Sequence, residues 1–406
     1  MIRIGKPRIE ECANGNSRLV ATISTADSVK DLWIEVPCLY RKYICDDRSD
    51  AFVIGLLYYA MSRKEDIVCD APVTDELRTQ IEEDFIDVIC RHEHGAVYKT
   101  RLICETISPI KKSERVLGCG CSCGVDSLYT IKRRLFQNEK ERRYLVLTNM
   151  HGAVEGDTAS SALRRWIELK RHAQMFADSI NIPLITIDSN YDQRCLPGLL
   201  YDNSTTYGNL FCVYALQKLF SHYYVAADGE ISVFGEYLKR GFGCDCAWYD
   251  LLSCSAWSVS GFHIIADGFT QRTEKVRVLC DWPLAWRFLD VCHVHGPKSK
   301  KRNGTNDCAK CMRTILEIMA CGENLLPRFA EVFDVDFVVS HKYQFLAELI
   351  RIKLHRTVYA EELWPHIRDM GFSFADWIAA LRIVLKKTFR KAIHWGVTNR
   401  DFLPEG

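Results

Sequence analysis

The middle of the chain alternates short apolar runs with longer amphipathic ones, and this alternation is the strongest constraint on its fold. Short runs typical of β-strands occur at 115–117, 144–148, 183–187 and 223–227. Between them lie runs typical of helices, including 158–180 and 210–220. Parallel strands need a crossover connection, which is usually a helix. The pattern therefore predicts an α/β fold with a doubly wound, mostly parallel sheet covered by helices on both faces.

The regions that flank this α/β segment have different patterns. Residues 1–112 mix strand-like and helical runs, such as an amphipathic helical run at 74–91, and predict an α+β accessory domain. The region 326–406 is mostly helical and ends in a predicted helix over 374–394. With 113–325 between them, we expect three domains, in line with about 150 residues per domain.

Composition narrows the classes of function. The 406 residues include 53 Lys and Arg against 52 Asp and Glu, a net charge of +1 that argues against a globally basic nucleic-acid-binding protein. We find no signal-peptide core and no run of about 18 apolar residues, so we expect a cytoplasmic protein without a membrane partner. Its 19 cysteines are then expected to be reduced, as packing residues, metal ligands or reactive groups.

A Gly- and Cys-rich turn, Gly118–Ser127, joins the first strand of the α/β segment to its helix. Ligands of such sheets bind at the carboxyl ends of the strands. A helix N-terminus at that edge offers free N–H groups and a positive dipole end, which suit phosphate. The turn contains neither GxxxxGK[ST] nor GxGxxG, so a Walker-type loop and the dinucleotide fingerprint are excluded.

Within this turn lies Ser122-Cys123-Gly124-Val125-Asp126-Ser127, which resembles the SGGxDS loop of the PP-loop ATP pyrophosphatases. That superfamily includes 7-cyano-7-deazaguanine synthases, asparagine-synthetase-like domains and tRNA-thiolation enzymes. Its members split ATP into AMP and pyrophosphate and activate a carboxylate or carbonyl oxygen as an adenylate, which an amine, ammonia or sulfur nucleophile then displaces. The resemblance implies that the loop holds the pyrophosphate part of ATP, with Mg²⁺, through Ser122, Cys123, Gly124, Val125, Asp126 and Ser127.

The departure from the family pattern is Cys123, where the family has glycine. Its N–H remains available, but its Cβ and sulfur crowd the place that phosphate should approach. The ends of the next two strands, Thr148 with Asn149 and then Asp188, are expected to flank adenosine.

Further along, the resemblance narrows to the 7-cyano-7-deazaguanine synthases. Asp267-Gly268 and then Arg272-Thr273-Glu274-Lys275-Val276 are similar to the segment of that group that reads Lys-x-Glu-Ile-Val. The resemblance implies a catalytic role for Arg272, which would neutralise charge on the leaving pyrophosphate, beside Asp126. The alternative is a surface helix that begins with charged residues.

A cysteine cluster follows this segment. The thiols of Cys308 and Cys311 have the C-x-x-C spacing that can bind one tetrahedral zinc ion at the start of a helix, and Cys292 precedes them. The placement also resembles the zinc site of the 7-cyano-7-deazaguanine synthases, although Thr305 stands where that family has a further cysteine. We expect Cys292, Cys308, Cys311 and a histidine, His295 or His293, as Zn²⁺ ligands. The alternative is a degenerate site with free thiols.

Together these resemblances imply an ATP-dependent, AMP-forming ligase that uses ATP, Mg²⁺ and Zn²⁺. The acceptor would be a deazapurine acid, another small-molecule acid or a partner protein. The partner protein is included because some relatives in bacterial anti-phage systems redirect the chemistry to a protein. Two alternatives stay open: a tRNA-modifying enzyme of the same superfamily, and a non-catalytic nucleotide-binding scaffold in which Cys123 and Thr305 are marks of decay.

Two basic segments bear on the tRNA alternative, a loop at Lys298–Arg302 and three residues at helical spacing on the last helix, Arg382, Lys386 and Arg390. We expect the helical residues to form a solvated face opposite a packed apolar face with Leu381, Val384 and Leu385. No RNA-binding signature accompanies either segment, so nucleic acid is not an expected partner.

Overall fold

The computed structural model describes residues 1–93, 95–137, 139–150, 159–192, 195–240, 245–292, 301–305, 308–355 and 357–398. The chain divides into two compact units, Met1–Thr270 and Gln271–Gly406. The expected boundaries after residues 112 and 325 do not coincide with this division.

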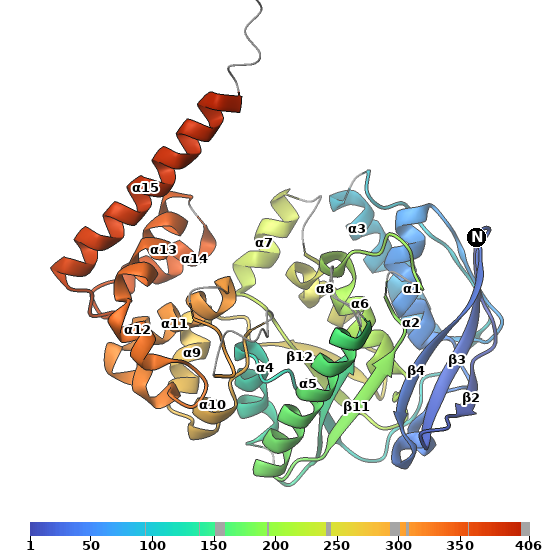
Figure 1. Ribbon diagram of the computed structural model, residues 1–406. Coiled ribbons are helices and arrows are strands. Elements are labelled where there is room, and N and C mark those ends of the chain that lie inside the picture. The colour runs from blue at the N-terminus through green and yellow to red at the C-terminus, as the bar shows by residue number, and fades with distance from the viewer. Residues whose placement is uncertain are drawn as a thin grey trace, which may run out of the picture. The chain divides into compact units, whose positions relative to one another are not determined.

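Within the described residues, eleven strands of the first unit form one sheet (Figure 1). One half of it is parallel and has the spatial order β13-β12-β9-β10-β11. These strands are β9 (Val116–Gly120), β10 (Arg142–Asn149), β11 (Leu184–Ser189), β12 (His222–Ala226) and β13 (His263–Asp267). The chain starts in the middle at β9, moves outward to β11, and returns past β9 to β12 and β13. This is the order of a doubly wound sheet, and the predicted α/β class with a mostly parallel sheet is confirmed.

The N-terminal region extends the same sheet. Strand β4 (Val29–Pro37) pairs antiparallel with β11, with Glu35 opposite Asp188 and Ile34 opposite Ser189. Beyond β4 the order is β3-β1-β5-β7, with β2 on β3. Their bounds are β1 (Ile2–Ile4), β2 (Arg8–Glu11), β3 (Asn16–Ser24), β5 (Ile67–Cys69) and β7 (Leu102–Ile103). A separate two-stranded sheet is formed by β6 (Val73–Thr74) and β8 (Thr106–Ile107).

Helices cover the parallel half of the sheet. Helix α4 packs on β9 and β12, and α5 packs on β10 and β11. Right-handed crossovers place these two helices on one face, and place α6 and α8, which contact β11 and β13, on the other. The helical elements of the first unit are η1 (Cys38–Tyr43), α1 (Asp50–Arg63), α2 (Asp75–Thr79), η2 (Gln80–Phe85), α3 (Ile86–His92), α4 (Val125–Thr130), η3 (Ile131–Leu135), α5 (Ala159–Ser179), α6 (Tyr201–Tyr214), α7 (Ile231–Arg240), η4 (Cys246–Tyr249) and α8 (Asp250–Ala256).

Three predicted helices have different outcomes. The helix expected at 158–180 is confirmed as α5. The helix expected at 74–91 is divided into α2, the π-helical turn η2 and α3. The helix expected at 210–220 was wrong in its bounds, because α6 begins at Tyr201 and ends at Tyr214.

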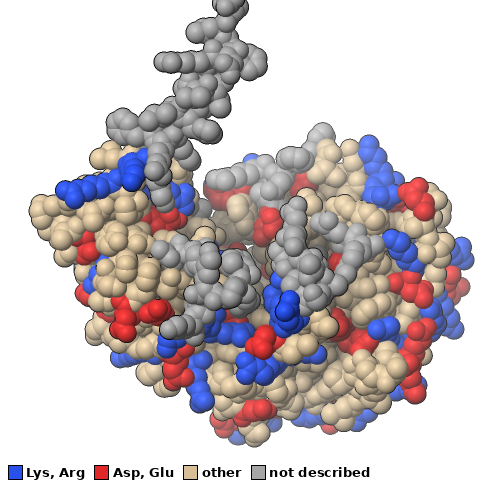
Figure 2. Space-filling model, in the orientation of Figure 1, with Lys and Arg blue, Asp and Glu red and all other residues tan. Residues whose placement is uncertain are grey.

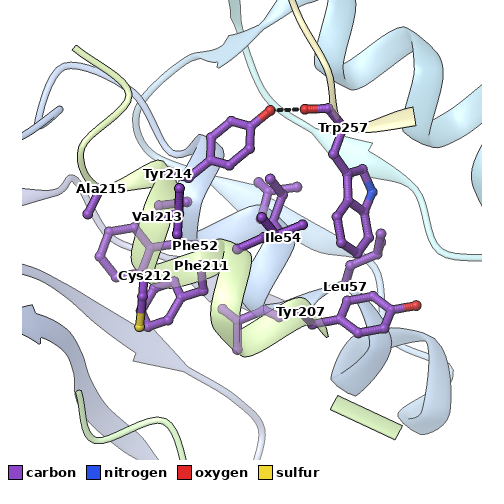
Figure 3. Packing of buried hydrophobic residues seen from close by; sticks show 14 of the residues in the cluster. Phe52, Ile54, Leu57, Tyr207, Phe211, Cys212, Val213, Tyr214, Ala215 and Trp257 are labelled. Carbon is purple, nitrogen blue, oxygen red and sulfur yellow. Dashed lines mark hydrogen bonds between the residues drawn. The ribbon is translucent and has the colours of Figure 1, made fainter. Parts of the chain in front are cut away.

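Helix α1 packs on α6 in the core of the first unit (Figure 3). The rings of Phe52 and Phe211 meet edge to face with centroids 5.4 Å apart. A Cβ on Gly55 would lie 2.9 Å from Cγ of Phe211, so glycine is required for the two helices to approach this closely. The hydroxyl of Tyr214 donates to the carbonyl oxygen of Trp257 and ties α6 to the end of α8.

The second unit is helical throughout its described residues. Its elements are α9 (Arg272–Cys280), α10 (Pro283–Phe288), α11 (Ala309–Cys321), η5 (Glu323–Phe329), α12 (Val335–Ser340), α13 (Lys342–Leu354), α14 (Val358–Leu363), η6 (Trp364–His366) and α15 (Phe374–Thr398). Helix α15 packs on α13, where Ala380 shares an apolar cluster with Leu346 and Ala347, and Val384 packs against this cluster. The packed face expected for this helix is therefore confirmed at Val384 but wrong for the other two residues, since Leu381 is 47% exposed and Leu385 is 57% exposed.

The surface of the described residues carries both signs of charge. On the face shown in Figure 2, basic and acidic side chains are interspersed, as the net charge of +1 suggests. In the part of the chain that the structure describes, none of the helices has both the length and the apolar character that crossing a membrane requires.

Candidate functional site

Strand β9, which leads into the loop, packs closely against two aromatic rings because residue 118 is glycine. A Cβ on Gly118 would lie 2.6 Å from the ring of Phe220 and 2.7 Å from the ring of Tyr223. These rings pack against the β9 backbone, and a larger residue would push the strand away from them. At the end of the strand, the N–H of Cys121 donates to the carbonyl oxygen of Val146 at 2.7 Å, which continues the pairing with β10. The loop therefore starts from a fixed position.

Two serine hydroxyls close the loop. The Oγ of Ser122 accepts a hydrogen bond from the N–H of Gly124 at 3.3 Å and lies 3.1 Å from the Oγ of Ser127. Ser127 in turn donates to the carbonyl oxygen of Gly124 at 3.1 Å. Helix α4 begins at Val125, so Asp126 is its second residue and is partly buried. The structure thus brings the six sequence-predicted loop residues into one turn between a strand and a helix.

Cys123 has the left-handed backbone conformation in this turn. Its φ is +58°, and only 1% of the residue is exposed. For a residue with a Cβ this conformation costs about 1–2 kcal/mol, whereas glycine adopts it freely. The position at which the predicted motif has glycine is therefore one at which the backbone favours glycine.

The loop lies where the strand order reverses. The chain moves from β9 to β10 on one side and returns to β12 on the other. In doubly wound sheets this reversal opens a crevice at the carboxyl ends of the strands, and ligands bind there. The loop 121–127 leaves β9 at that edge of the sheet.

The strand ends beside the loop carry the other residues predicted for nucleotide binding. Asn149 and Asp188 are opposite each other in the β10–β11 register, and the amide of Asn149 donates to Asp188 at 2.7 Å. Burial raises the pKa of Asp188, against the lowering effect of this hydrogen bond. Thr148 donates to the side-chain oxygen of Asn209 on α6 at 2.7 Å. Asn209 was missed by the sequence analysis, because its place beside β10 depends on a long-range contact.

A buried carboxylate ends the strand β13. The Asp267 side chain is 2% exposed and pairs with Arg134 at 2.6 Å, while Arg133 lies 3.9 Å from the same oxygen. Its second oxygen has no hydrogen-bond partner among the described residues. The sequence analysis identified Asp267 within its motif but not Arg134, which reaches it from the π-helical turn η3.

Arg272, the predicted catalytic arginine, is the first residue of α9 in the second unit. Its side chain is 7% exposed and lies 3.1 Å from the carboxylate of Glu317 on α11. The neighbouring Glu274 pairs with Arg277 one turn along α9. Within its unit, Arg272 is thus a buried member of an ion pair between two helices and not part of an exposed charged helix start.

The predicted metal-binding cysteines come together at the start of α11. Cys292, Cys308 and Cys311 are all buried, and their sulfur atoms lie within 4.8 Å of one another. Burial, followed by the two neighbouring thiols, raises the pKa of Cys311. The predicted fourth ligand, His295 or His293, lies outside the described residues.

An asparagine holds the first of these cysteines in place. The side-chain oxygen of Asn303 accepts hydrogen bonds from the N–H groups of Val291 at 2.8 Å and Cys292 at 3.2 Å. Its amide donates to the carbonyl oxygen of Leu289 at 2.8 Å, and the residue is fully buried. Asn303 was missed by the sequence analysis, since a single asparagine between basic and polar residues resembles an ordinary loop residue.

Three thiolates at such separations match the ligand preference of zinc, which binds sulfur tetrahedrally at about 2.3 Å. Buried thiols are also costly to ionise unless a cation lies nearby. The donors present therefore fit Zn²⁺, with the fourth position open to a further ligand.

Comparison of the chain with models of known protein families, with curated proteins and with solved structures found no match.

Proposed function

We propose that the protein is an ATP-dependent, AMP-forming ligase of the PP-loop type, with ATP held by the loop after β9. The observation that carries the proposal is the left-handed backbone at Cys123, inside a Ser-x-Gly-x-Asp-Ser loop between a strand and a helix. Gly124 follows with an extended backbone, so the chain turns at Cys123 and then enters helix α4. The free N–H groups at such a helix start can bind phosphate.

The position of the loop supports the same proposal. It lies at the reversal point of the sheet, where nucleotides bind in doubly wound folds. The hydrogen bonds of Ser122 and Ser127 hold the turn in shape without a ligand, so little ordering would be needed on binding. In this proposal the N–H groups of residues 122, 123 and 125 bind the pyrophosphate part of ATP, while the N–H of Gly124 stays on Ser122.

The remaining roles follow from charge and position. Asp126 supplies a carboxylate oxygen for Mg²⁺, which is bound in proteins mainly through carboxylates, phosphates and water. Thr148, Asn149 and Asp188 flank adenosine. Catalysis then rests on positioning of the reactants and on stabilisation of the leaving group.

Zinc has a structural role in this proposal. Cys292, Cys308 and Cys311 would hold it through thiolates and fix the start of α11 to the chain before it. The acceptor is a small-molecule carboxylic acid, such as a deazapurine acid, or a carboxylate of a partner protein, and the nucleophile is an amine.

The proposal is tested by titration of Mg·ATP into the purified protein in a calorimeter. We expect saturable binding that weakens at least about tenfold in Asp126→Ala, because the metal ligand is lost. Asp75→Ala is the matched control: Asp75 also begins a short helix, α2, but in an exposed position. Incubation with α-labelled ATP and candidate acids should then yield AMP and no ADP.

Other outcomes would lead to different conclusions. If the folded, zinc-loaded protein binds no ATP, the ligase proposal is wrong. If it binds ATP but forms no AMP with any acid or partner, the non-catalytic nucleotide-binding scaffold is favoured instead. The interspersed charges of the face shown in Figure 2 do not support the tRNA-modifying alternative. Co-purified RNA whose affinity falls steeply with salt would support it.

A further inference from the structure

Helices α9 and α11 lie side by side and end at a pair of cysteines. The ion pair of Arg272 with Glu317 joins the two helices. Cys280 is the last residue of α9, and Cys321 is the last residue of α11, one turn after Glu317. The thiol of Cys321 donates to the carbonyl oxygen of Thr273 at 3.6 Å and is also in contact with the thiol of Cys280. Both are reduced and lie outside the zinc cluster.

The two thiols differ in access. A cavity of about 580 Å³ in the second unit is lined by Cys321 together with Met319, Gly322, Glu323, Lys342 and Asp369. Cys280 does not line it and is 1% exposed, whereas Cys321 is partly exposed. A molecule in the cavity can therefore contact Cys321, whereas Cys280 is not accessible from the cavity.

The thiol of Cys321 donates to the carbonyl oxygen of Thr273, and ionisation would release this hydrogen bond. The contact with Cys280 lowers the pKa of Cys321 most, burial opposes this, and the charge of Arg277 lowers it further. Burial and the same contact raise the pKa of Cys280. The nucleophilic sulfur is the accessible one, since thiolates and not thiols attack disulfides.

We propose that Cys321 is a site of thiol–disulfide exchange with low-molecular-weight disulfides that enter this cavity, and that Cys280 resolves the mixed disulfide. The inference concerns the second unit alone and does not depend on ATP binding.

The exchange has two balanced steps. The Cys321 thiolate attacks one sulfur of a disulfide RSSR, the S–S bond breaks, and RS⁻ leaves with Cys321–S–S–R formed. The Cys280 thiol then attacks the sulfur of Cys321, its proton passes to the second departing RS⁻, and a Cys280–Cys321 disulfide remains. Two protein thiols are oxidised and one RSSR is reduced to two RSH.

The cavity also indicates which disulfides would enter. Its charged lining residues are Glu323, Asp369 and Lys342, and Lys342 is paired with Glu323. The net charge of these lining residues is therefore negative. A negatively charged cavity favours a cationic disulfide such as cystamine over an anionic one such as oxidised glutathione.

The chain contains two internal controls. Cys69 and Cys104 form a similar pair of thiols in hydrogen-bond contact, at the ends of the neighbouring strands β5 and β7, but neither borders this cavity. Cys38 is exposed and has neither a thiol partner nor a place in the zinc cluster among the described residues. Both are expected to react more slowly than Cys321.

The experiment treats the folded, zinc-loaded protein with cystamine or oxidised glutathione, blocks the remaining thiols and maps tryptic peptides over time. Trypsin places Cys280 in peptide 278–287 and Cys321 in peptide 314–328. We expect these two peptides to become linked, with the loss of two hydrogen atoms. The reaction should be about tenfold faster than modification of Cys38, and faster with cystamine.

Variants separate the two steps. Cys280→Ser should accumulate the mixed disulfide on Cys321, and Cys321→Ser should leave Cys280 unmodified. Modification of Cys321 no faster than Cys38, or no linkage of the two peptides in the wild-type chain, would overturn the proposal. Equal oxidation of Cys69 and Cys104 would show that pairing alone causes the reactivity and would overturn the role of the cavity.

Discussion

The guanidinium of Arg272 lies 3.1 Å from the carboxylate of Glu317, and both side chains are buried. Glu317 also lies 3.5 Å from Arg313 one turn earlier on α11. The helix that carries this carboxylate begins directly after Cys308 and contains Cys311. The residue predicted to be catalytic is therefore held by the same helix that carries Cys311 of the predicted metal cluster.

Glu317→Gln is expected to lower the free energy of unfolding by about 3 kcal/mol. The substitution removes the carboxylate that compensates two guanidinium groups, and breaking a buried pair leaves charge without its partner. Urea unfolding measures the change. The matched control is Glu348→Gln, whose pair with Arg351 on α13 is partly exposed and should cost less than about 1 kcal/mol. Similar losses in both variants would contradict a special role for the buried pair.

The left-handed backbone at Cys123 predicts an unusual order of stabilities in a substitution series. Cys123→Gly should remain within about 1 kcal/mol of the wild type, because the relief of backbone strain offsets the lost buried side chain. Cys123→Ala keeps the strain and loses the sulfur, and should cost about 1 kcal/mol more than glycine. Cys123→Val, branched at Cβ, should be the least stable of the three.

Thermal unfolding of the three variants tests this order. An ordinary helical or extended backbone at residue 123 would make glycine the most destabilising substitution, which is the reverse of the expected result. If the ligase proposal is right, Cys123→Gly should also bind Mg·ATP at least as tightly as the wild type, since glycine adopts the left-handed backbone without strain.

The parts of the fold that could be predicted from the sequence are those specified by local patterns. The helix at 158–180 and the strands on either side of it follow from apolar periodicity, and the loop after β9 follows from its small residues. The start of α6 could not be predicted in this way. Its polar residues resemble a loop, but the hydroxyl of Thr206 is buried and donates to Asp250 at 2.6 Å. The hydrogen bond that offsets the cost of burying this hydroxyl comes from a residue 44 positions away.

The same limit applies to the candidate site. The spacing of Cys308 and Cys311 is local and predicted the cluster, whereas Asn303 and Arg134 act through contacts that only the folded chain provides. Residues 1–112 were predicted to be a separate domain because the pattern of apolar residues changes after them. In the structure β4 pairs with β11, so this region continues the sheet of the α/β segment. Antiparallel pairing across such a boundary leaves no periodic signal in the sequence.

Asn303→Ala is expected to weaken both folding and metal binding. The substitution leaves two buried N–H groups and one carbonyl oxygen without their partner, at a cost of about 2–3 kcal/mol. Because it frees the segment that carries Cys292, the zinc content per chain should also fall. Elemental analysis and thermal unfolding measure the two effects.

Cys308→Ser and Cys38→Ser give the comparison for the metal site. The first should reduce bound zinc and stability together, and removal of zinc by a chelator should add little to its loss of stability. The second changes an exposed cysteine and should alter neither. Full zinc content in Cys308→Ser would mean that the cluster is not the metal site.

Glu93 predicts a dependence of stability on pH. The residue is 3% exposed, and burial raises its pKa from 4.5 to about 7, although Tyr58 donates to its carboxylate at 3.4 Å. The neutral form is favoured in the folded protein. Its contribution to stability is therefore complete below the unfolded pKa of 4.5 and is lost as the pH rises through 7.

Glu93→Gln removes this ionisation while it keeps an oxygen that can accept from Tyr58. From pH 5 to pH 8, the stability of the variant relative to the wild type should rise by about 2 kcal/mol. Urea unfolding at the two pH values measures this difference, and the buried Asp250, whose pKa is raised to about 8, affects both proteins alike. Glu83→Gln, on an exposed position of η2, is the control and should show no such change. A constant difference between Glu93→Gln and the wild type would mean that Glu93 titrates at the same pH in the folded and unfolded chains.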